Sequence, residues 1–77
     1  MRIKVRAYTA LREYTDVLPP GGAMEVEEGL SVGEVLVRLG VPSEIPKVIL
    51  VNGRHREETY LLGPDDEVVI FQPMEGG

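Results

Sequence analysis

The chain has 77 residues, contains no cysteine and carries a formal net charge of −5. This length corresponds to one domain with a modest core, and the lack of cysteine excludes disulfides, a thiolate nucleophile, cysteine-ligated zinc and iron–sulfur clusters. The acidity argues against a nucleic-acid or anionic-membrane binder and favours protein partners with basic docking surfaces, although solubility alone would explain it equally well.

The first third of the chain predicts two strands joined by a long connection. Residues 2–8 alternate strictly between apolar and polar side chains, which is typical of a half-buried strand. Residues 10–14 are compatible with one helical turn, and the Pro-Pro-Gly-Gly of residues 19–22 is expected to break any regular structure. Alternation resumes over residues 23–27, so we expect a β-hairpin.

The clearest helix is predicted over Ser31–Leu39. Ser31 and Glu34 have the spacing of a capping box, in which each side chain binds an otherwise unpaired backbone N–H. Gly40 is a typical C-terminal stop, and Pro42 prevents continuation. One apolar stripe follows the helical period: Val32, Val35, Leu36 and Leu39.

The second half predicts three more strands. Residues 48–51 are an uninterrupted apolar run, as expected for a strand covered on both faces. Asn52-Gly53 is a strong two-residue hairpin turn, and it leads to a short polar strand at residues 54–56. After a turn at residues 61–64, the apolar run at residues 68–71 predicts a last strand in the centre of the sheet.

The resulting order of elements is β-β-α-β-β-β. One helix must then cover a twisted, mixed sheet of four or five strands, which is an α+β roll of the β-grasp, or ubiquitin-like, type. We expect residues 1–72 to form this domain and residues 73–77 to form a flexible C-terminal tail.

Side chains offer few candidates for chemistry. The sequence has no P-loop, dinucleotide fingerprint, zinc spacing or nucleophile elbow. We expect the acid pairs Glu57-Glu58 and Asp65-Asp66 to be solvated, and His55 to be exposed. Three bases should line the outer face of the first strand, where a docking role is the alternative to simple solvation: Arg2, Lys4 and Arg6.

The tail is the exception. Gly76-Gly77 ends the chain shortly after the last predicted strand. Five extended residues from Pro73 reach about 17 Å, enough to carry a carboxylate into a partner's cleft. Glycine lacks Cβ, so such a tail can pass through a narrow channel. The alternative is a frayed end without function.

Across nearly its whole length the chain resembles the ubiquitin-like sulfur carriers of the MoaD/ThiS group, especially the small subunit of molybdopterin synthase. Each matching segment is short, but their order and spacing are fairly specific to the group. The segments are Tyr8-Thr9-Ala10-Leu11-Arg12-Glu13, the Ser31–Leu39 helix, Val51-Asn52-Gly53-Arg54, Gly63-Pro64-Asp65-Asp66-Glu67-Val68 and Gly76-Gly77.

The resemblance implies that the reacting group is the C-terminal carboxylate of Gly77. A ubiquitin-activating-type adenylating enzyme would use ATP to form an acyl-adenylate, and a persulfide sulfur donor would convert it to a thiocarboxylate. In the molybdopterin branch the tail then enters the large subunit of the synthase and gives sulfur to a pterin precursor. The chain itself would be no enzyme on its own and would bind no cofactor, metal, nucleic acid or membrane.

The resemblance also implies a partner-binding surface. Phe71, Tyr8 and Arg12 match interface positions of the family, and core packing or solvation is the alternative at each. Tail residues would bind partners as well: Pro73, Met74, Glu75 and Gly76. The family often has two prolines before the tail where this chain has Gln72-Pro73 followed by Met74-Glu75, which leaves the sulfur acceptor open.

Other functions remain compatible with the sequence. The chain could supply sulfur for thiamine thiazole or amino-acid biosynthesis, act as a protein modifier joined to lysines through Gly77, or be a non-catalytic interaction module. The segment Leu11-Arg12-Glu13 and the long first loop favour the molybdopterin branch. With no secretory signal, membrane-spanning run or lipidation motif, we expect a cytoplasmic protein.

Overall fold

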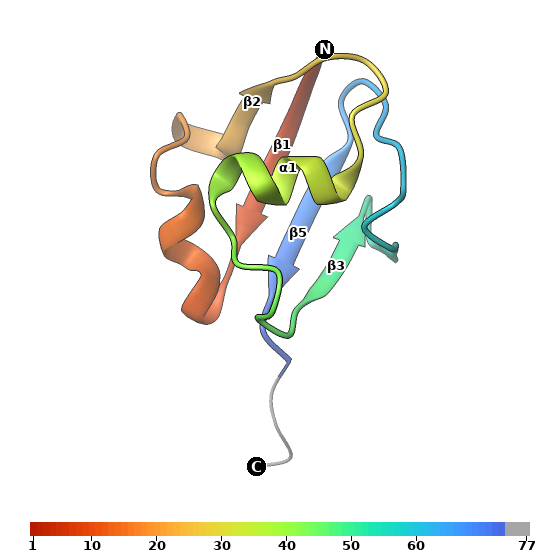
Figure 1. Cartoon of the computed structure of the whole chain (residues 1–77). Coiled ribbons are helices and arrows are strands. Elements are labelled where there is room, and N and C mark those ends of the chain that lie inside the picture. The colour runs from red at the N-terminus through yellow and green to blue at the C-terminus, as the bar shows by residue number, and fades with distance from the viewer. Residues whose placement is uncertain (74–77) are drawn as a thin grey trace.

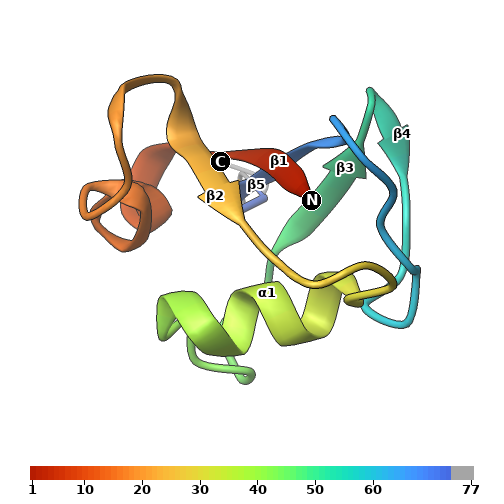
Figure 2. The ribbon, with the colours of Figure 1, turned by 90° about the horizontal axis from the view of Figure 1, so that it is seen from above.

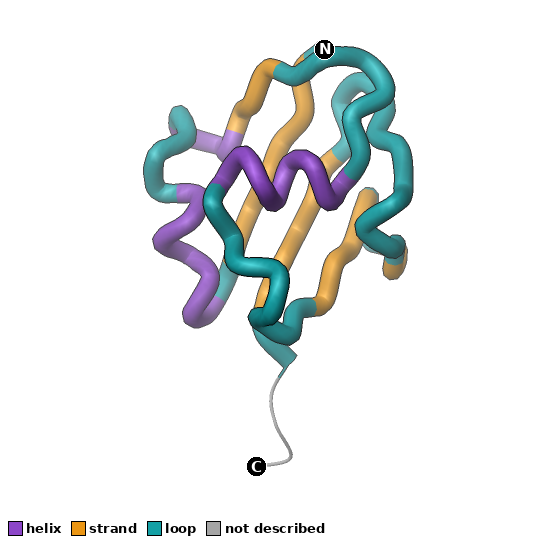
Figure 3. The backbone as a smooth tube through the Cα atoms, viewed as in Figure 1, coloured by secondary structure: helices purple, strands orange, loops and turns teal. Residues whose placement is uncertain are grey.

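A five-stranded mixed sheet forms the frame of the computed structural model, which describes residues 1–73 (Figure 1). The strand order is β2-β1-β5-β3-β4, with one α-helix and two short 3-10 helices (Figure 3). This is the predicted β-grasp roll. The elements are β1 Arg2–Ala7, η1 Thr9–Thr15, η2 Pro20–Gly22, β2 Ala23–Glu25, α1 Val32–Leu39, β3 Val48–Val51, β4 Arg54–His55 and β5 Glu67–Phe71.

β5 lies in the centre of the sheet, as its apolar sequence predicts. It pairs in parallel with β1 and antiparallel with β3. β2 pairs antiparallel with β1, and β4 with β3, so both outer strands come from hairpins. The parallel central pair joins the first strand of the chain to the last one and thereby places the chain's C-terminal segment beside the end of β1.

The helix α1 has the predicted caps. The Ser31 hydroxyl accepts a hydrogen bond from the Glu34 N–H, and the Glu34 carboxylate accepts one from the Ser31 N–H, each at 3.2 Å. At the other end Gly40 takes a left-handed conformation with φ +79°, which glycine adopts without steric cost. The helix therefore ends on both sides as its sequence predicts.

α1 covers only one face of the sheet (Figure 2). Alternate strand residues face the helix and are buried, such as Ile3 and Val5 on β1 and Val68 and Ile70 on β5. The prediction that residues 48–51 are covered on both faces is wrong, because Val48 and Leu50 are only half-buried. A single helix packs against one face of a sheet only, and no other element among residues 1–73 covers the second face.

The Asn52-Gly53 hairpin is confirmed. Both residues have positive φ, +52° and +84°, as a type I′ turn requires. The Asn52 side chain then donates to Asp66 at 2.9 Å and accepts from the Glu67 N–H at 3.0 Å. Asp66 also accepts from the Gly63 N–H at 2.7 Å, so it is a half-buried turn residue rather than the solvated carboxylate that we expected.

Three local predictions need correction. The helical turn expected at residues 10–14 is a longer 3-10 helix, η1, that buries Leu11. The Pro-Pro-Gly-Gly segment is not fully irregular, because it contains the short helix η2. β2 ends at Glu25 rather than at residue 27, because its partner runs out at the N-terminus, where Val26 and Met1 exchange the last two backbone hydrogen bonds. His55, Glu57, Glu58 and Asp65 are exposed, as predicted. In the part of the chain that the structure describes, no helix has the length and apolar character needed to cross a bilayer.

Candidate functional site

Four apolar side chains lie together on the sheet face opposite α1. Val48 of β3 is paired with Phe71 of β5, and Leu50 of β3 with Val69 of β5. Directly paired residues on one face of a sheet are neighbours, so the four form a compact two-by-two group. We call it the open-face patch: Val48, Leu50, Val69 and Phe71, each half-buried. Its members are shielded by one another and not by a covering element of residues 1–73.

Charged residues border the open-face patch along β1. Arg6 is in register with Val69, and its Nε lies 3.3 Å from a carboxylate oxygen of Glu67. Lys4 is exposed and in register with Glu67. On the other side His55 of β4 is paired with Leu50. The patch is therefore an apolar centre with a polar and mainly basic rim, the arrangement found in protein–protein interfaces.

The C-terminal segment leaves the domain at the edge of this patch. Phe71 is the last residue of β5, and Gln72 and Pro73 follow it. The end of β5 is held against the end of β1, because the Tyr8 N–H donates to the Ile70 carbonyl at 3.0 Å. The Gln72 N–H also donates to the Thr9 hydroxyl at 3.4 Å. Pro73, the last residue that the structure describes, is thus two residues along the chain from Phe71 of the open-face patch.

Thr9 has an unusual backbone at this junction. Its φ is +57°, a left-handed conformation that is rare for a β-branched residue. Its hydroxyl donates to the Tyr8 carbonyl at 2.6 Å, which helps to hold the sharp turn from β1 into η1. The strain is therefore located where β1, η1 and the residues after β5 meet.

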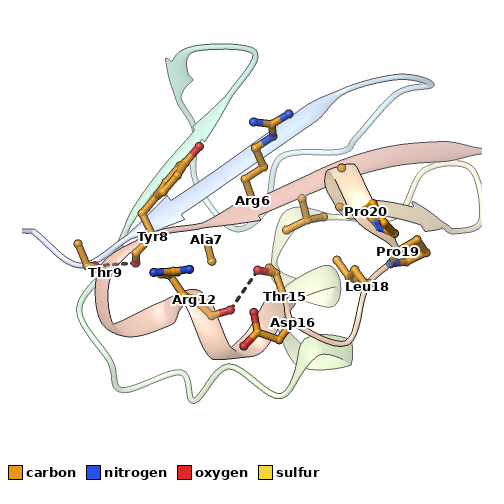
Figure 4. A pocket seen from close by; sticks show the side chains of 13 residues that line it. Arg6, Ala7, Tyr8, Thr9, Arg12, Thr15, Asp16, Leu18, Pro19 and Pro20 are labelled. Carbon is orange, nitrogen blue, oxygen red and sulfur yellow. Dashed lines mark hydrogen bonds between the residues drawn. The ribbon is translucent and has the colours of Figure 1, made fainter.

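The structure brings the three predicted interface residues into one region. Phe71 is part of the open-face patch, and Tyr8, 46% exposed, projects from the end of β1 beside it. Arg12 is exposed on η1 and lies near Tyr8 at the border of a groove (Figure 4). Pro73 is exposed. The remaining predicted site residues lie outside the described residues: Met74, Glu75, Gly76 and Gly77.

Sequence reasoning missed three members of the patch. Val48, Leu50 and Val69 were assigned to strands but not to a surface. A signal existed, because β3 and β5 are apolar at every position from 48 to 51 and from 68 to 71, whereas one short helix can cover only one face. Residues 1–73 contain no group of three or more His, Asp or Glu side chains placed to hold a metal ion.

A mixed sheet with one helix on one face, and a chain end leaving beside a partly apolar open face, defines a ubiquitin-like protein. The chain matches the ThiS family over residues 5–77 and belongs to that family. It has the fold of ThiS-type, ubiquitin-like sulfur carriers and modifiers.

Solved structures share this fold, among them two from Haloferax volcanii. SAMP1 from Haloferax volcanii superposes with a TM-score of 0.74 at 18% identity, over 100% of both chains. A second structure, of H. volcanii small archaeal modifier protein 1, gives a TM-score of 0.72 at 18% identity, over 95% of this chain and 98% of that one. At this identity the likeness establishes the fold alone. No curated protein matches the chain in sequence.

Proposed function

We propose that this chain is a sulfur carrier that is activated and thiocarboxylated at the carboxylate of Gly77. The observation behind the proposal is the family match, which extends over residues 5–77 and includes the final Gly76-Gly77. The position of Pro73 beside the open-face patch supports it, because a partner that binds the patch also receives the residues that follow. The side chains of residues 1–73 supply the docking surface, and the reacting group is a main-chain carboxylate.

The chemistry needs a partner. A carboxylate resists nucleophilic attack because it is anionic and has no good leaving group. An adenylating enzyme joins it to the α-phosphate of ATP with loss of pyrophosphate, which makes AMP the leaving group. A persulfide sulfur then displaces AMP, and cleavage of the resulting acyl disulfide by a thiol frees the thiocarboxylate. Binding the domain beside the active site makes the first step effectively intramolecular.

The open-face patch is the surface that we assign to the adenylating enzyme. Phe71 and Tyr8 are aromatic, and aromatic residues are enriched at the energetic centres of interfaces. From Pro73, four further extended residues reach about 13–14 Å. A partner bound to the open-face patch can therefore hold the nucleotide within reach of the Gly77 carboxylate.

The sulfur acceptor we favour is the pterin precursor of the molybdenum or tungsten cofactor, delivered within a complex with a molybdopterin synthase large subunit. The support is the resemblance of the segment Leu11-Arg12-Glu13, which lies on η1 next to the predicted interface. Glu75 adds a negative charge that the receiving channel must accommodate.

A second candidate function is protein modification. The solved structures of similar fold include a small archaeal modifier protein. Activation would be the same, but the amine of a target lysine would displace AMP in place of the persulfide. Carrier and modifier functions therefore share the first step and differ in the nucleophile of the second.

Intact mass spectrometry tests the carrier function. The chain is expressed with its adenylating enzyme and persulfide donor, and its intact mass is measured beside that of a variant lacking Gly77. Exchange of one oxygen for sulfur adds about 16 Da, and we expect this species only in the intact chain. Its persistent absence, with adenylation demonstrated, would refute the carrier function.

The modifier function has its own readout. The last basic residue of the chain is Arg56, so trypsin leaves a long remnant on a modified lysine, whereas a glutamate-specific protease cuts after Glu75 and leaves Gly-Gly. Such remnants on cellular lysines would establish conjugation. If removal of Gly76 and Gly77 left the physiological function intact, both functions would be wrong and a simple interaction module would remain.

A further inference from the structure

One edge of β1 is paired over only half its length. β2 pairs with Arg2, Ile3 and Lys4, and Gly22 lies against the backbone of Val5. No strand among residues 1–73 pairs with Ala7 along this edge. The N–H groups of Lys4 and Tyr8 point to the other side, where they bind carbonyl groups of the β5 segment. Since backbone groups alternate along a strand, those of Val5 and Ala7 point to the half-paired edge. Gly22 covers the groups of Val5, so those of Ala7 are the ones that face the groove.

A groove lies over this edge. It has a volume of about 980 Å³ and is bordered by β1, η1 and the segment that leads to η2 (Figure 4). Leu18, Pro19 and Pro20 form an apolar wall opposite the backbone of β1. The wall is fixed in place at Gly22, which has φ +75° and lies so close to the Val5 carbonyl that a Cβ at this position would collide with it. The groove is thus preformed by the packing of η2 against β1.

The charge of the groove is opposite to that of the chain. Arg6 and Arg12 both contribute to its lining, and Asp16 is the only acid of residues 1–73 that does. Arg6 forms an ion pair with Glu67, but Arg12 has no carboxylate within ion-pair distance among residues 1–73. In a chain of net charge −5, this is a local site of positive potential beside unpaired strand backbone.

We propose that the groove binds an extended acidic segment of a partner protein. The segment pairs with the backbone of Ala7, next to the position that Gly22 already covers, and places its carboxylates against Arg6 and Arg12. Strand addition at a sheet edge is a common mode of peptide recognition, in which backbone hydrogen bonds give affinity and side-chain contacts give specificity. An arginine pairs with a carboxylate through two parallel hydrogen bonds, which favours an acidic segment over a merely polar one.

This site is separate from the chemistry of Gly77. It lies on the β2 side of β1, whereas the open-face patch lies over β3 and β5. A partner could therefore hold the domain through the groove while the open-face patch and the chain end are engaged elsewhere. Tyr8 and Arg12 lie where the two surfaces meet.

The test uses the full chain, labelled with ¹⁵N, and no other protein. The probe is a seven-residue peptide, capped at both ends, of sequence Asp-Leu-Glu-Val-Asp-Leu-Glu, and the control peptide has lysine at each acidic position. We expect the acidic peptide alone to cause saturable shifts in the amide signals of residues 5–9, 12–18, 21 and 22. We also expect slower hydrogen exchange of the residue 7 amide, because strand addition gives it a partner.

Two variants sharpen the test. Arg12→Glu should weaken binding of the acidic peptide about tenfold or more, since it replaces an attractive charge by a repulsive one. The matched control Arg54→Glu reverses an exposed arginine on β4, at the opposite edge of the sheet, and should change the affinity less than twofold. The amide spectrum of each variant reports whether it is folded.

Several outcomes would overturn the proposal. Equal binding of the two peptides would show that charge does not select the ligand, and shifts without protection of the residue 7 amide would exclude strand addition. If neither peptide bound and Glu75→Gln shifted the groove signals, the chain's own tail would be the occupant. None of these measurements involves adenylation. A negative result in them would therefore not contradict the proposed function of Gly77, and a failure of that function would not contradict peptide binding in the groove.

Discussion

The two faces of the sheet are built from the same kinds of side chain in different surroundings. On β5, Val68 and Ile70 point toward α1 and are fully buried, whereas Val69 and Phe71 alternate with them and are half-buried. β3 repeats the pattern, with Ile49 facing the helix side. One face is closed by an element of this chain, and the other is closed by none among residues 1–73.

This difference separates stability from recognition. Residues on the helix side contribute the packing that folds a small domain, where each buried group matters because the core is modest. Apolar residues on the open side lower the solubility of the chain and add less to its stability than residues on the helix side do. Apolar groups at such exposed positions are typical of a binding surface. Substitutions at adjacent positions of one strand should therefore have different consequences.

The largest effect is expected from Ile70→Ala. Ile70 is completely buried, and its truncation leaves a cavity that should lower the free energy of unfolding by about 2–5 kcal/mol. Val69→Ala, one residue away on the open side, should cost less than about 1 kcal/mol. Urea unfolding followed by circular dichroism measures both. Similar losses at the two positions would contradict the contrast between the faces.

The next effect should appear in partner binding rather than in stability. Phe71→Thr keeps a residue that favours strands but removes the aromatic ring from the open-face patch. We expect the KM of the adenylating enzyme for this chain to rise about tenfold to thirtyfold, with kcat unchanged, because the ring binds the ground state and the transition state alike.

Val37→Thr is the matched control for that experiment. Val37 is 76% exposed on the outer side of α1, so the same kind of change there should leave KM within about twofold of the unaltered chain. Pyrophosphate exchange gives both constants. An equal response of the two variants would show that the open-face patch is not the docking surface.

Local patterns predicted the elements that depend on near neighbours in sequence. The Ser31–Glu34 capping box, the Asn52-Gly53 turn and the strand alternation of residues 2–8 each involve contacts within a few residues. The central place of β5 was also predictable, since an uninterrupted apolar run is rare in an edge strand.

The features that sequence reasoning missed depend on tertiary placement. Thr9 adopts a φ of +57°, a backbone conformation that is unfavourable for a β-branched residue. Residue propensities therefore gave no reason to expect this conformation at Thr9. The groove exists because η2 packs against β1 and β2 begins only at Ala23, opposite Lys4, and neither feature has a local signature in the sequence. The open-face patch was missed because an apolar run predicts that both faces of a strand are buried. The run does not show whether the second face is buried by the same chain or by a partner.

A smaller effect on the helix side is expected from Ser31→Ala. It removes the acceptor for the Glu34 N–H and should lower the free energy of unfolding by about 1 kcal/mol. Ser43→Ala, at an exposed position outside the helix, should change it by less than about 0.5 kcal/mol. Since α1 closes only the buried face, KM for the adenylating enzyme should not move in either variant. A rise in KM after Ser31→Ala would mean that the two faces are coupled.

The smallest effect should come from the ion pair between Glu27 and Arg38, which joins the segment after β2 to α1. The hydrogen bonds from Arg38 lower the pKa of Glu27 from its ordinary value of 4.5 to about 2. The unfolded chain therefore takes up a proton at this carboxylate at higher pH than the folded chain does. The contribution of the pair is fully present above about pH 4.5 and is lost as the pH falls through about 2.

Glu27→Gln tests whether the ion pair stabilises the folded chain at neutral pH and loses this effect as the pH falls. The variant should unfold slightly more easily than the unaltered chain at pH 7, and the difference should shrink toward zero between pH 4.5 and pH 2. The pair is exposed, so 1 M salt should reduce the difference at pH 7. Glu28→Gln, at the neighbouring exposed position, makes no ion pair among residues 1–73 and should leave the pH profile in place. A difference that grew on acidification would show that the pair does not act in the folded state as its geometry implies.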